Sequence, residues 1–241
     1  MTRLFVSDLH LDAASPQSIE QFLGFLRTEA SRAEALYILG DLFEAWIGDD
    51  DPEPARARVC EALRELTAGG VACFALHGNR DFLLGEGFSQ RTGCVLLPDP
   101  VIAEIDGERV LLTHGDALCR GDRSYQELRS TVRDVSWQQR FLALPLAVRA
   151  RLADRARAGS RAHTARVVPR IMDVDPAAVA AAYRATGARR IIHGHTHRPG
   201  IHESMLDGGP ACRIVLGAWY EQGSVLVARG GGYTLRELAR G

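Results

Sequence analysis

The sequence contains no lysine, so all 29 of its basic side chains are arginines. Genome composition alone can produce this bias, and we give it little functional weight. Cysteine is also scarce: the five residues are scattered, odd in number and never spaced as C-x-x-C. This pattern argues against a disulfide framework or a zinc knot and predicts small buried thiols instead.

Long hydrophobic runs are missing as well. No apolar stretch approaches the 18 residues that indicate a membrane span, and the segment after Met1 lacks the features of a signal peptide. We therefore expect a cytoplasmic protein. With 241 residues, 46% of them hydrophobic, the chain is long enough for one large domain with a full core.

The formal net charge of -1 conceals a basic block. Residues 120–170 hold 12 arginines against four acidic side chains, a local excess of +8. Such a block is typical of proteins that bind nucleic acid, an anionic lipid surface or a phosphorylated ligand. Charge alone does not choose among these three.

Short apolar runs alternate with helical patterns, which predicts an α/β layered fold in a single domain over residues 1–241. Helices should begin at Ser15-Pro16 and at Asp175-Pro176, because a capping residue before proline marks a first helical turn. The expected strands are 4–7, 35–39, 71–76, 109–113 and 190–192, followed by a meander over 214–216, 224–227 and 233–238.

Residues 122–167 break this alternation. Their composition is helical, with Trp137, Phe141 and Leu152 on one face, and Pro145 requires a kink or a new start. The pattern predicts a helical insertion. It leaves open whether the insertion only packs on the core or caps an active site.

Polar residues of similar chemistry follow five of the predicted strands. Because strands of an open α/β sheet end at one crevice, ligands distant in sequence can converge there. One such motif alone would indicate a turn or a structural histidine, but five in register favour a shared metal site. The motifs are Asp8-x-His10, Gly40-Asp41, Gly78-Asn79-Arg80-Asp81, His114-Gly115-Asp116 and Gly194-His195-Thr196-His197.

In this order the motifs resemble the signature of the calcineurin-like metallophosphoesterases. The resemblance implies a layered sandwich of mixed sheets flanked by helices, with a helical cap, and a site for two metal ions. One ion would be bound by Asp8, His10, Asp41 and His197, and the other by Asp41, Asn79, His114 and His195, with Asp41 bridging. Imidazole, carboxylate and amide ligands suit Mn, Fe or Zn, and the family resemblance favours two Mn²⁺.

Most members of that superfamily have histidine where this chain has Arg80. Arginine is no proton donor near neutral pH, but its planar fork stabilises an anionic leaving group. The residue chemistry therefore favours a pyrophosphate bond, whose leaving group is already an anion, over an alkyl phosphodiester.

Longer segments are similar to a narrower family, the UDP-2,3-diacylglucosamine diphosphatases of lipid A biosynthesis. They are FVSDLHL, ALYILGDLFEAWIGDDD, HGNRDFLLG, IMDVD and IHGHTHRPGIHE. The similarity implies hydrolysis of UDP-2,3-diacylglucosamine by metal-activated water attack at the α-phosphorus. The products would be UMP and 2,3-diacylglucosamine 1-phosphate (lipid X). Catalytic roles would fall to Asp41, Asn79, Arg80 and His195.

Two acyl chains need an apolar cleft, and the candidates for its walls are Trp46, Phe82, Phe141, Leu142 and Leu146. The insertion would then serve as a cap and contact an anionic membrane surface, where each basic residue contributes about 1 kcal/mol. This places the protein peripherally on the cytoplasmic face of the inner membrane. A pair of solvated, charged helices is the alternative interpretation.

The substrate contacts of that family carry over unevenly. Asn79, Arg80 and His195 match, and Asp122 and Ser160 also match in the insertion. Many relatives have Asn at the position of Thr164 and Lys at the position of Val167; Arg166 is the candidate replacement for that Lys. The acidic run 49–51 is interpreted as the start of a helix and not as a third metal site.

Other functions share the metal signature. A dinucleoside polyphosphatase, a cyclic nucleotide phosphodiesterase or a protein phosphatase would not explain Arg80 and the basic, apolar insertion. A nuclease is disfavoured by the pI near 6.7 and by the lack of an aromatic stacking series, so no nucleic-acid partner is expected. A scaffold protein would be expected to have lost ligands, and no obligate protein partner is evident.

Overall fold

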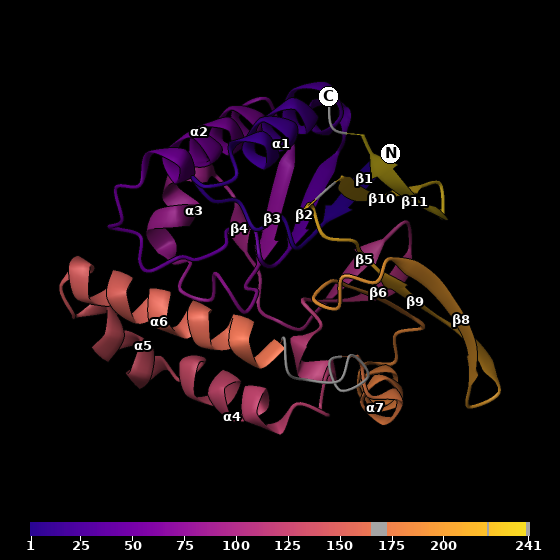
Figure 1. Cartoon of the computed structure of the whole chain (residues 1–241). Coiled ribbons are helices and arrows are strands. Elements are labelled where there is room, and N and C mark those ends of the chain that lie inside the picture. Colours follow the sequence, from indigo (N-terminus) through magenta and orange to yellow (C-terminus); the bar gives the residue numbers. More distant parts are fainter. Residues whose placement is uncertain (165–172, 221, 240–241) are drawn as a thin grey trace.

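The computed structural model describes residues 1–164, 173–220 and 222–239, with side chains omitted at 161–164. Two mixed β-sheets pack face to face, and helices cover their outer surfaces (Figure 1). The predicted layered α/β fold is therefore confirmed.

The first sheet has the strand order β11-β10-β1-β2-β3-β4. Strands β1 to β4 run parallel, and β10 and β11 join the β1 edge as an antiparallel pair. The bounds are Thr2–Val6 (β1), Ala35–Leu39 (β2), Ala72–Leu76 (β3), Val95–Leu96 (β4), Gly223–Arg229 (β10) and Gly232–Leu238 (β11).

The second sheet has the order β5-β6-β7-β9-β8, with a parallel centre of β6, β7 and β9. The bounds are Val101–Ile105 (β5), Glu108–Thr113 (β6), Arg190–His193 (β7), Gly200–Leu206 (β8) and Gly209–Val215 (β9). Strands β4, β5 and β8 were not predicted. Two of them belong to hairpins that turn at Asp106-Gly107 and Asp207-Gly208, where all four φ angles are positive. Asp-Gly is a strong hairpin signal, so the sequence contained the evidence for these hairpins.

Apolar side chains from both sheets fill the space between them. Phe5 and Phe74 each stack on Tyr37, with ring centroids 4.8 Å apart in both pairs. Ile192 and Ile214 of the second sheet belong to the same buried cluster. Complete burial of an aliphatic or aromatic side chain contributes about 1.5–3 kcal/mol, so this layer fixes one sheet against the other.

The thiols also follow the prediction. Cys60, Cys73, Cys94 and Cys119 are buried and unpaired, and Cys212 is half-buried.

Helices α1 (Pro16–Thr28), α2 (Pro54–Ala68) and α3 (Glu86–Thr92) cover the first sheet, and α7 (Pro176–Thr186) covers the second. Both predicted starts are confirmed. The Asp175 carboxylate accepts a hydrogen bond from Ala177 N at 2.8 Å, whereas the Ser15 side chain makes no capping bond. Among the described helices, none is long and apolar enough to cross a membrane.

The predicted insertion contains three helices: α4 (Arg123–Val132), α5 (Val135–Leu142) and α6 (Leu146–Thr164). Pro145 precedes α6, so the proline marks a new start and not a kink. The three helices lie together beside the loops that follow the strands of the first sheet (Figure 1). The predicted end of the insertion at residue 167 lies outside the described residues.

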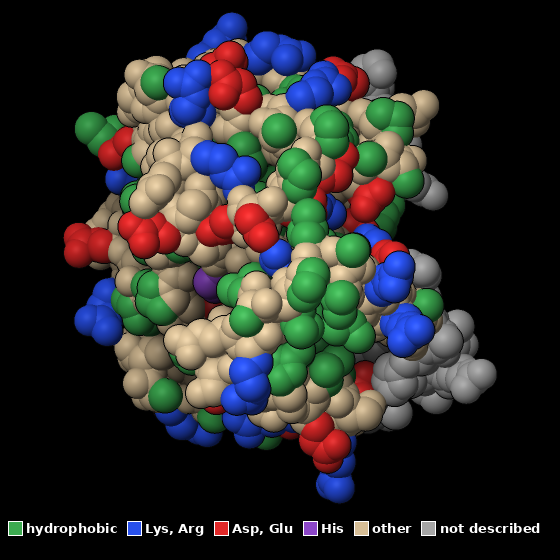
Figure 2. All heavy atoms as spheres, turned by 90° about the vertical axis from the view of Figure 1, so that its left-hand side faces the viewer, with side chains coloured by type: hydrophobic (Ala, Val, Ile, Leu, Met, Phe, Trp, Pro, Cys, Tyr) green, Lys and Arg blue, Asp and Glu red, His purple; other side chains and the backbone are tan. Residues whose placement is uncertain are grey.

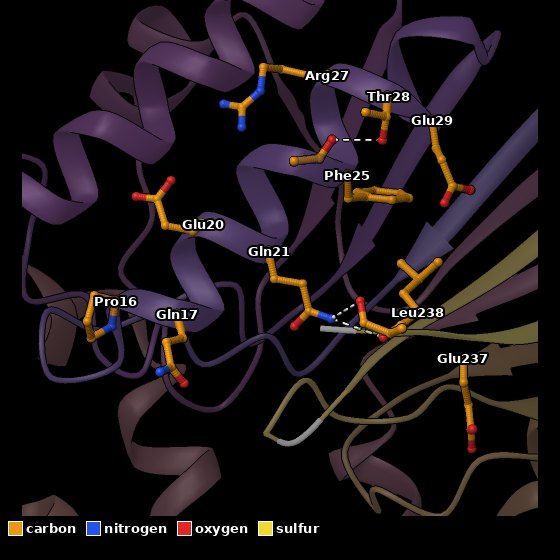
Figure 3. A pocket seen from close by; sticks show the side chains of 12 residues that line it. Pro16, Gln17, Glu20, Gln21, Phe25, Arg27, Thr28, Glu29, Glu237 and Leu238 are labelled. Atoms are coloured by element: carbon orange, nitrogen blue, oxygen red, sulfur yellow. Dashed lines mark hydrogen bonds between the residues drawn. The ribbon is translucent and has the colours of Figure 1, made fainter. Parts of the chain in front are cut away.

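A groove of about 820 Å³ runs between α1 and the end of β11 (Figure 3). The Gln21 side chain donates to Leu238 O at 3.0 Å across this groove and so ties the last strand to α1. None of the five sequence motifs contributes to its lining.

Candidate metal centre and adjoining cavity

The five motifs meet at the carboxyl ends of β1, β2, β3, β6 and β7. Asn79 lies at the centre of one group: its Oδ1 is 2.9 Å from His114 Nε2 and 2.9 Å from His195 Nδ1. Three loops that are far apart in sequence therefore present potential ligand atoms to one point.

A second group lies beside the first. His197 Nε2 is 3.2 Å from Asp8 Oδ1, and His10 Nε2 is 3.4 Å from His197 Nε2 and 4.0 Å from Asp8 Oδ1. Ligand atoms of these three residues lie close enough together to hold one metal ion.

Asp41 stands between the two groups. Its Oδ2 is 3.8 Å from His10 Nε2 and also 3.8 Å from His114 Nε2. Its other oxygen accepts a hydrogen bond from Arg80 N at 2.8 Å, which fixes the carboxylate. The geometry thus suits a carboxylate shared by two cations.

The backbone at this cluster is unusual. Positive φ is uncommon outside glycine, although Asp and His adopt it more often than most residues. Among the described residues other than glycine, only Asp106 and Asp207 have positive φ besides five of the predicted ligands. Those five are Asp8, His10, Asp41, His195 and His197, with φ between 49° and 66°. Such strain is typical of functional sites, where the surrounding structure maintains it.

Glycines provide the space that this geometry needs. A Cβ atom on Gly78 would lie 2.0 Å from Asp41 Oδ1, and one on Gly194 would lie 2.2 Å from Asp8 Oδ2. Gly40 and Gly115 have φ of 89° and 108°, which favour glycine. These glycines therefore allow the close approach of the ligand-bearing loops.

Two carboxylates are buried in the cluster. Asp8 and Asp41 are almost fully buried, and among the described residues only histidines lie within ion-pair distance of them. Burial lowers the pKa of His114, but the Asp41 and Asp8 carboxylates outweigh it and raise that pKa to about 9. Bound divalent cations would balance this charge.

Two histidines are oriented by hydrogen bonds on the far side of their rings. His114 Nδ1 lies 2.9 Å from Leu39 O and donates to it. His10 Nδ1 lies 3.1 Å from Glu44 Oε2. These contacts point Nε2 of each ring into the cluster, which is the usual arrangement for metal-binding histidines.

Asp81 is a functional residue to which the sequence analysis assigned no role. It is completely buried, and its carboxylate accepts hydrogen bonds from the backbone N–H groups of Asp41, Leu42, Phe43 and Gly78 at 2.7–3.3 Å. It therefore joins the loop after β2 to the loop after β3. Its position as the last residue of the Gly78-Asn79-Arg80-Asp81 motif was the only feature of the sequence that could have indicated this role.

A cavity of about 600 Å³ opens beside Asn79 and Arg80, between the core and the insertion. Trp46, Phe82 and Phe141 line it as predicted. Leu142 lies instead in a separate pocket of about 290 Å³, and Leu146 is absent from the lining, so both assignments were wrong. Leu142 is next to Phe141, which does line the cavity, and Leu146 is the first residue of α6, whose lining residues begin at Leu152.

The predicted substrate contacts divide into three groups. Asn79, Arg80 and Ser160 line the cavity, and the buried Arg80 Nε has no hydrogen-bond partner among the described residues. Asp122, which caps α4 by accepting from Tyr125 N at 3.0 Å, and His195 are absent from the cavity lining. The Thr164 side chain and the whole of Arg166 lie outside what the structure describes.

The acidic run 49–51 does not mark one helix start. Asp49 accepts hydrogen bonds from Gly85 N at 3.2 Å and Gly87 N at 2.8 Å, at the beginning of α3. Asp50 pairs with Arg149 of the insertion, and only Asp51 pairs with the first turn of α2, through Arg56. Side chains of adjacent residues point in different directions, and the sequence interpretation ignored this.

Helix α4 is attached directly to the metal-centre loops. Its Tyr125 ring stacks on His195 with centroids 5.7 Å apart, and the Tyr125 hydroxyl donates to Asp116 Oδ2 at 2.6 Å. Arg129 Nε donates to the same carboxylate oxygen at 2.9 Å. Arg133 donates to Gly78 O at 2.9 Å. This part of the insertion thus helps to build the site.

The layered sandwich and its clustered Asp, Asn and His side chains define a hydrolase of the metal-dependent phosphoesterase class. The chain belongs to the calcineurin-like phosphoesterase family, whose model matches residues 1–199. A solved structure described as a novel archaeal phosphodiesterase covers 99% of this chain and 100% of its own, with 16% identity and a TM-score of 0.50. That likeness supports the fold alone.

Full-length relatives are more specific. A protein of Stenotrophomonas maltophilia strain R551-3, named UDP-2,3-diacylglucosamine hydrolase, is 51% identical over 248 residues, with 100% of both chains covered. A protein of the same name from Xanthomonas oryzae pv. oryzae strain PXO99A is 50% identical, over 99% of this chain and 100% of its own.

Proposed function

We propose that the protein hydrolyses the pyrophosphate bond of UDP-2,3-diacylglucosamine, giving UMP and 2,3-diacylglucosamine 1-phosphate (lipid X). One observation carries the proposal: the metal-ligand cluster opens at Asn79 and Arg80 into a cavity with aromatic and aliphatic walls. A lipid-linked diphosphate has a polar reacting centre next to long apolar chains, and this arrangement suits both. The names of the full-length relatives support the same substrate.

The seven clustered side chains are the proposed ligands for two Mn²⁺ ions. Asp8, His10 and His197 would hold one ion, and Asn79, His114 and His195 the other, with Asp41 shared. The short distances among these atoms and the buried carboxylates support a cation site. Fe and Zn suit the same mixture of ligands. Two such cations supply a water molecule of lowered pKa and neutralise the phosphoryl oxygens.

In the proposed reaction, a water oxygen bonds to the α-phosphorus as the bond from that phosphorus to the bridging oxygen breaks. The electron pair leaves with the sugar phosphate. Arg80 is the proposed stabiliser of this leaving group, because its guanidinium faces the cavity and its Nε lacks a protein partner among the described residues. Asn79 and His195, from opposite loops, would orient the reacting phosphate.

The acyl chains are assigned to the cavity. Trp137 stacks on Phe141 with centroids 5.1 Å apart and lies 6.2 Å from the Phe82 ring, so the walls form a continuous aromatic surface. Arg157 and Ser160 of α6 line the same cavity and supply polar groups for the sugar end. A cavity of this size and polarity is typical of binding sites for lipid-like ligands.

Peripheral binding to an anionic membrane is also proposed. Hydrophobic and basic side chains lie side by side on the face that carries the insertion (Figure 2). Leu128, Val135, Leu142, Val148 and Leu152, all from its three helices, are 38–65% exposed. Apolar contacts together with basic residues favour the surface of an anionic bilayer.

The decisive assay measures UMP release from UDP-2,3-diacylglucosamine with Mn²⁺, beside generic phosphoesters and single-stranded DNA. We expect the diacylated substrate to be turned over with the greatest kcat/KM. Hydrolysis of the generic esters alone would refute the substrate assignment, and salt-sensitive DNA cleavage would favour a nuclease. Substoichiometric Mn²⁺ without any activity would favour a scaffold protein.

A further inference from the structure

Arg149, in the first turn of α6, is the only buried arginine among the described residues, at 2% exposure. Arginine is seldom buried unless its charge and its five N–H groups have partners. The hydrogen-bond partners of the Arg149 guanidinium therefore indicate its structural role.

The guanidinium of Arg149 joins two separate parts of the molecule. Its Nε donates to Leu144 O at 3.0 Å, in the turn between α5 and α6. Its Nη1 donates to Ile47 O at 2.5 Å and to Asp50 Oδ1 at 2.8 Å, and its Nη2 binds the other Asp50 oxygen. One side chain thus holds the α5–α6 turn to the loop between β2 and α2.

Gly48 leaves the space for this contact. A Cβ atom at this position would lie 2.2 Å from Arg149 Nη1 and 2.6 Å from Asp50 Oδ1. Gly48 also has φ of 138°, which side chains rarely adopt. The loop is therefore shaped around the guanidinium.

The two peptide groups that Arg149 binds belong to opposite walls of the cavity. Ile47 lines the cavity on the side of the core, and Leu144 lines it on the side of the insertion. Arg149 itself is absent from the lining. Its hydrogen bonds therefore fix how far apart the two walls stand without any contact to a ligand.

We propose that Arg149 and Asp50 form a clamp that sets the width of the cavity and so positions the acyl chains of the substrate. The inference rests on the proposed function and adds a positioning pair to it. Only the arginine of this ion pair is buried, so the pair is weak evidence for stability, but the fixed fork of the guanidinium is well suited to holding two segments in register.

The clamp acts on α5 and α6 only. Helix α4 has its own attachment, through Arg129 to Asp116 at 2.9 Å and through Arg133 to Gly78 O at 2.9 Å. Loss of the clamp should therefore displace the acyl-chain walls and leave the metal-ligand loops in place. We expect KM for the diacylated substrate to rise while kcat is retained.

The experiment compares Arg149→Gln, Arg149→Lys and Asp50→Asn with wild type. We expect Arg149→Gln to raise KM for UDP-2,3-diacylglucosamine about 10-fold, because small displacements of positioning groups have large effects. Asp50→Asn should act similarly. Arg149→Lys keeps the charge without the planar fork, so its KM should lie between the wild-type value and that of Arg149→Gln. Hydrolysis of bis(p-nitrophenyl) phosphate with Mn²⁺, which does not use the acyl walls, should change little in any of them.

Arg184→Gln is the matched control. Arg184 also forms a two-bond pair with a single carboxylate, that of Asp207, at 3.0 Å for both contacts, but on the exposed surface between α7 and the β8–β9 turn. It should leave KM unchanged. A rise in KM there equal to that of Arg149→Gln would overturn the clamp.

Two further results would also overturn it. One is an unchanged KM in both Arg149→Gln and Asp50→Asn. The other is an equal loss of activity toward bis(p-nitrophenyl) phosphate and the diacylated substrate, which would locate the damage at the proposed metal centre. If Arg149→Gln does not fold, Asp50→Asn decides the matter, because the Asp50 side chain is 63% exposed.

If wild type releases no UMP, the proposed substrate is wrong, and amide hydrogen exchange over 146–156 then tests the clamp by itself. Asp50→Asn should exchange faster there, and equal exchange would refute the clamp.

Discussion

Asp81 Oδ1 accepts a hydrogen bond from the backbone nitrogen of Asp41 at 3.2 Å, so one buried carboxylate positions another. The same side chain binds three more N–H groups in the loops after β2 and β3. Asp81→Asn replaces one acceptor oxygen with a donor and sets it against backbone N–H groups. We expect a loss of about 2 kcal/mol in the free energy of unfolding, measured by urea denaturation, together with weaker Mn²⁺ binding. Unchanged values of both would contradict this role.

Asp41 is the proposed shared ligand. Two replacements distinguish loss of its negative charge from loss of its hydrogen bond to the Arg80 backbone. Asp41→Asn keeps an oxygen that accepts from Arg80 N, whereas Asp41→Ala loses this contact as well. Both variants should fold, by circular dichroism, and both should lose hydrolysis and bind fewer than two Mn²⁺ by metal analysis. Near-normal turnover in either variant would contradict a shared carboxylate.

Arg80 is expected to act on the leaving group and not on the metal ions. Arg80→Ala should retain Mn²⁺ and lose about 100-fold in kcat, the typical effect of removing one donor that stabilises developing charge. Arg80→Lys should recover part of that loss, because the charge returns without the planar fork. Single-turnover kinetics with unchanged rates in Arg80→Ala would dismiss the leaving-group role.

The clustering of the candidate metal ligands was the feature most readily predicted from sequence, for a physical reason. The carboxyl ends of neighbouring parallel strands lie at one edge of a sheet, however long the connections between the strands are. The order of the motifs after the strands was therefore sufficient to predict that they converge. The seven proposed ligands cluster in two adjoining groups, and their role as metal ligands stays a prediction. The composition of the sequence does not indicate the strained φ angles at five of them.

The walls of the cavity were harder to predict, because one residue along a helix turns the side chain by roughly 100°. Leu142 was assigned to the wall for its hydrophobicity, yet its neighbour Phe141 faces the cavity. Asp122 similarly matches a family position but here caps α4. Contacts such as that of Arg149 with Ile47 O join residues about 100 positions apart, and no local pattern indicates them.

Removal of the metal ions should cost stability as well as activity. The Asp8 and Asp41 carboxylates are buried close together, and in the described structure only histidines lie within ion-pair distance of them, so cations that bind there favour the folded state. At a Mn²⁺ concentration 100-fold above Kd, each site contributes about 2.7 kcal/mol, which raises Tm by about 5 °C or more. Differential scanning calorimetry with EDTA and with Mn²⁺ measures this shift. Equal Tm values in the two conditions would argue against a cation site.

Trp137 offers a test of the cavity that leaves the metal centre intact. Its ring lies against Phe141 and Phe82 in the cavity wall, and Trp137 is not one of the proposed metal ligands. Trp137→Ala removes much of this apolar surface, so the acyl chains lose contacts worth about 1–2 kcal/mol, equivalent to a rise in KM of roughly 10-fold. Hydrolysis of an aryl phosphoester should be unaffected, because that substrate has no acyl chain.

The control for Trp137→Ala is Met205→Ala, in the exposed β8–β9 hairpin. The Met205 side chain is 72% exposed and does not line the cavity. It should leave both activities unchanged. If Trp137→Ala reduced aryl ester hydrolysis as strongly as hydrolysis of the diacylated substrate, the cavity would not be the acyl-chain site. A selective rise in KM would instead tie the apolar wall to the lipid part of the substrate.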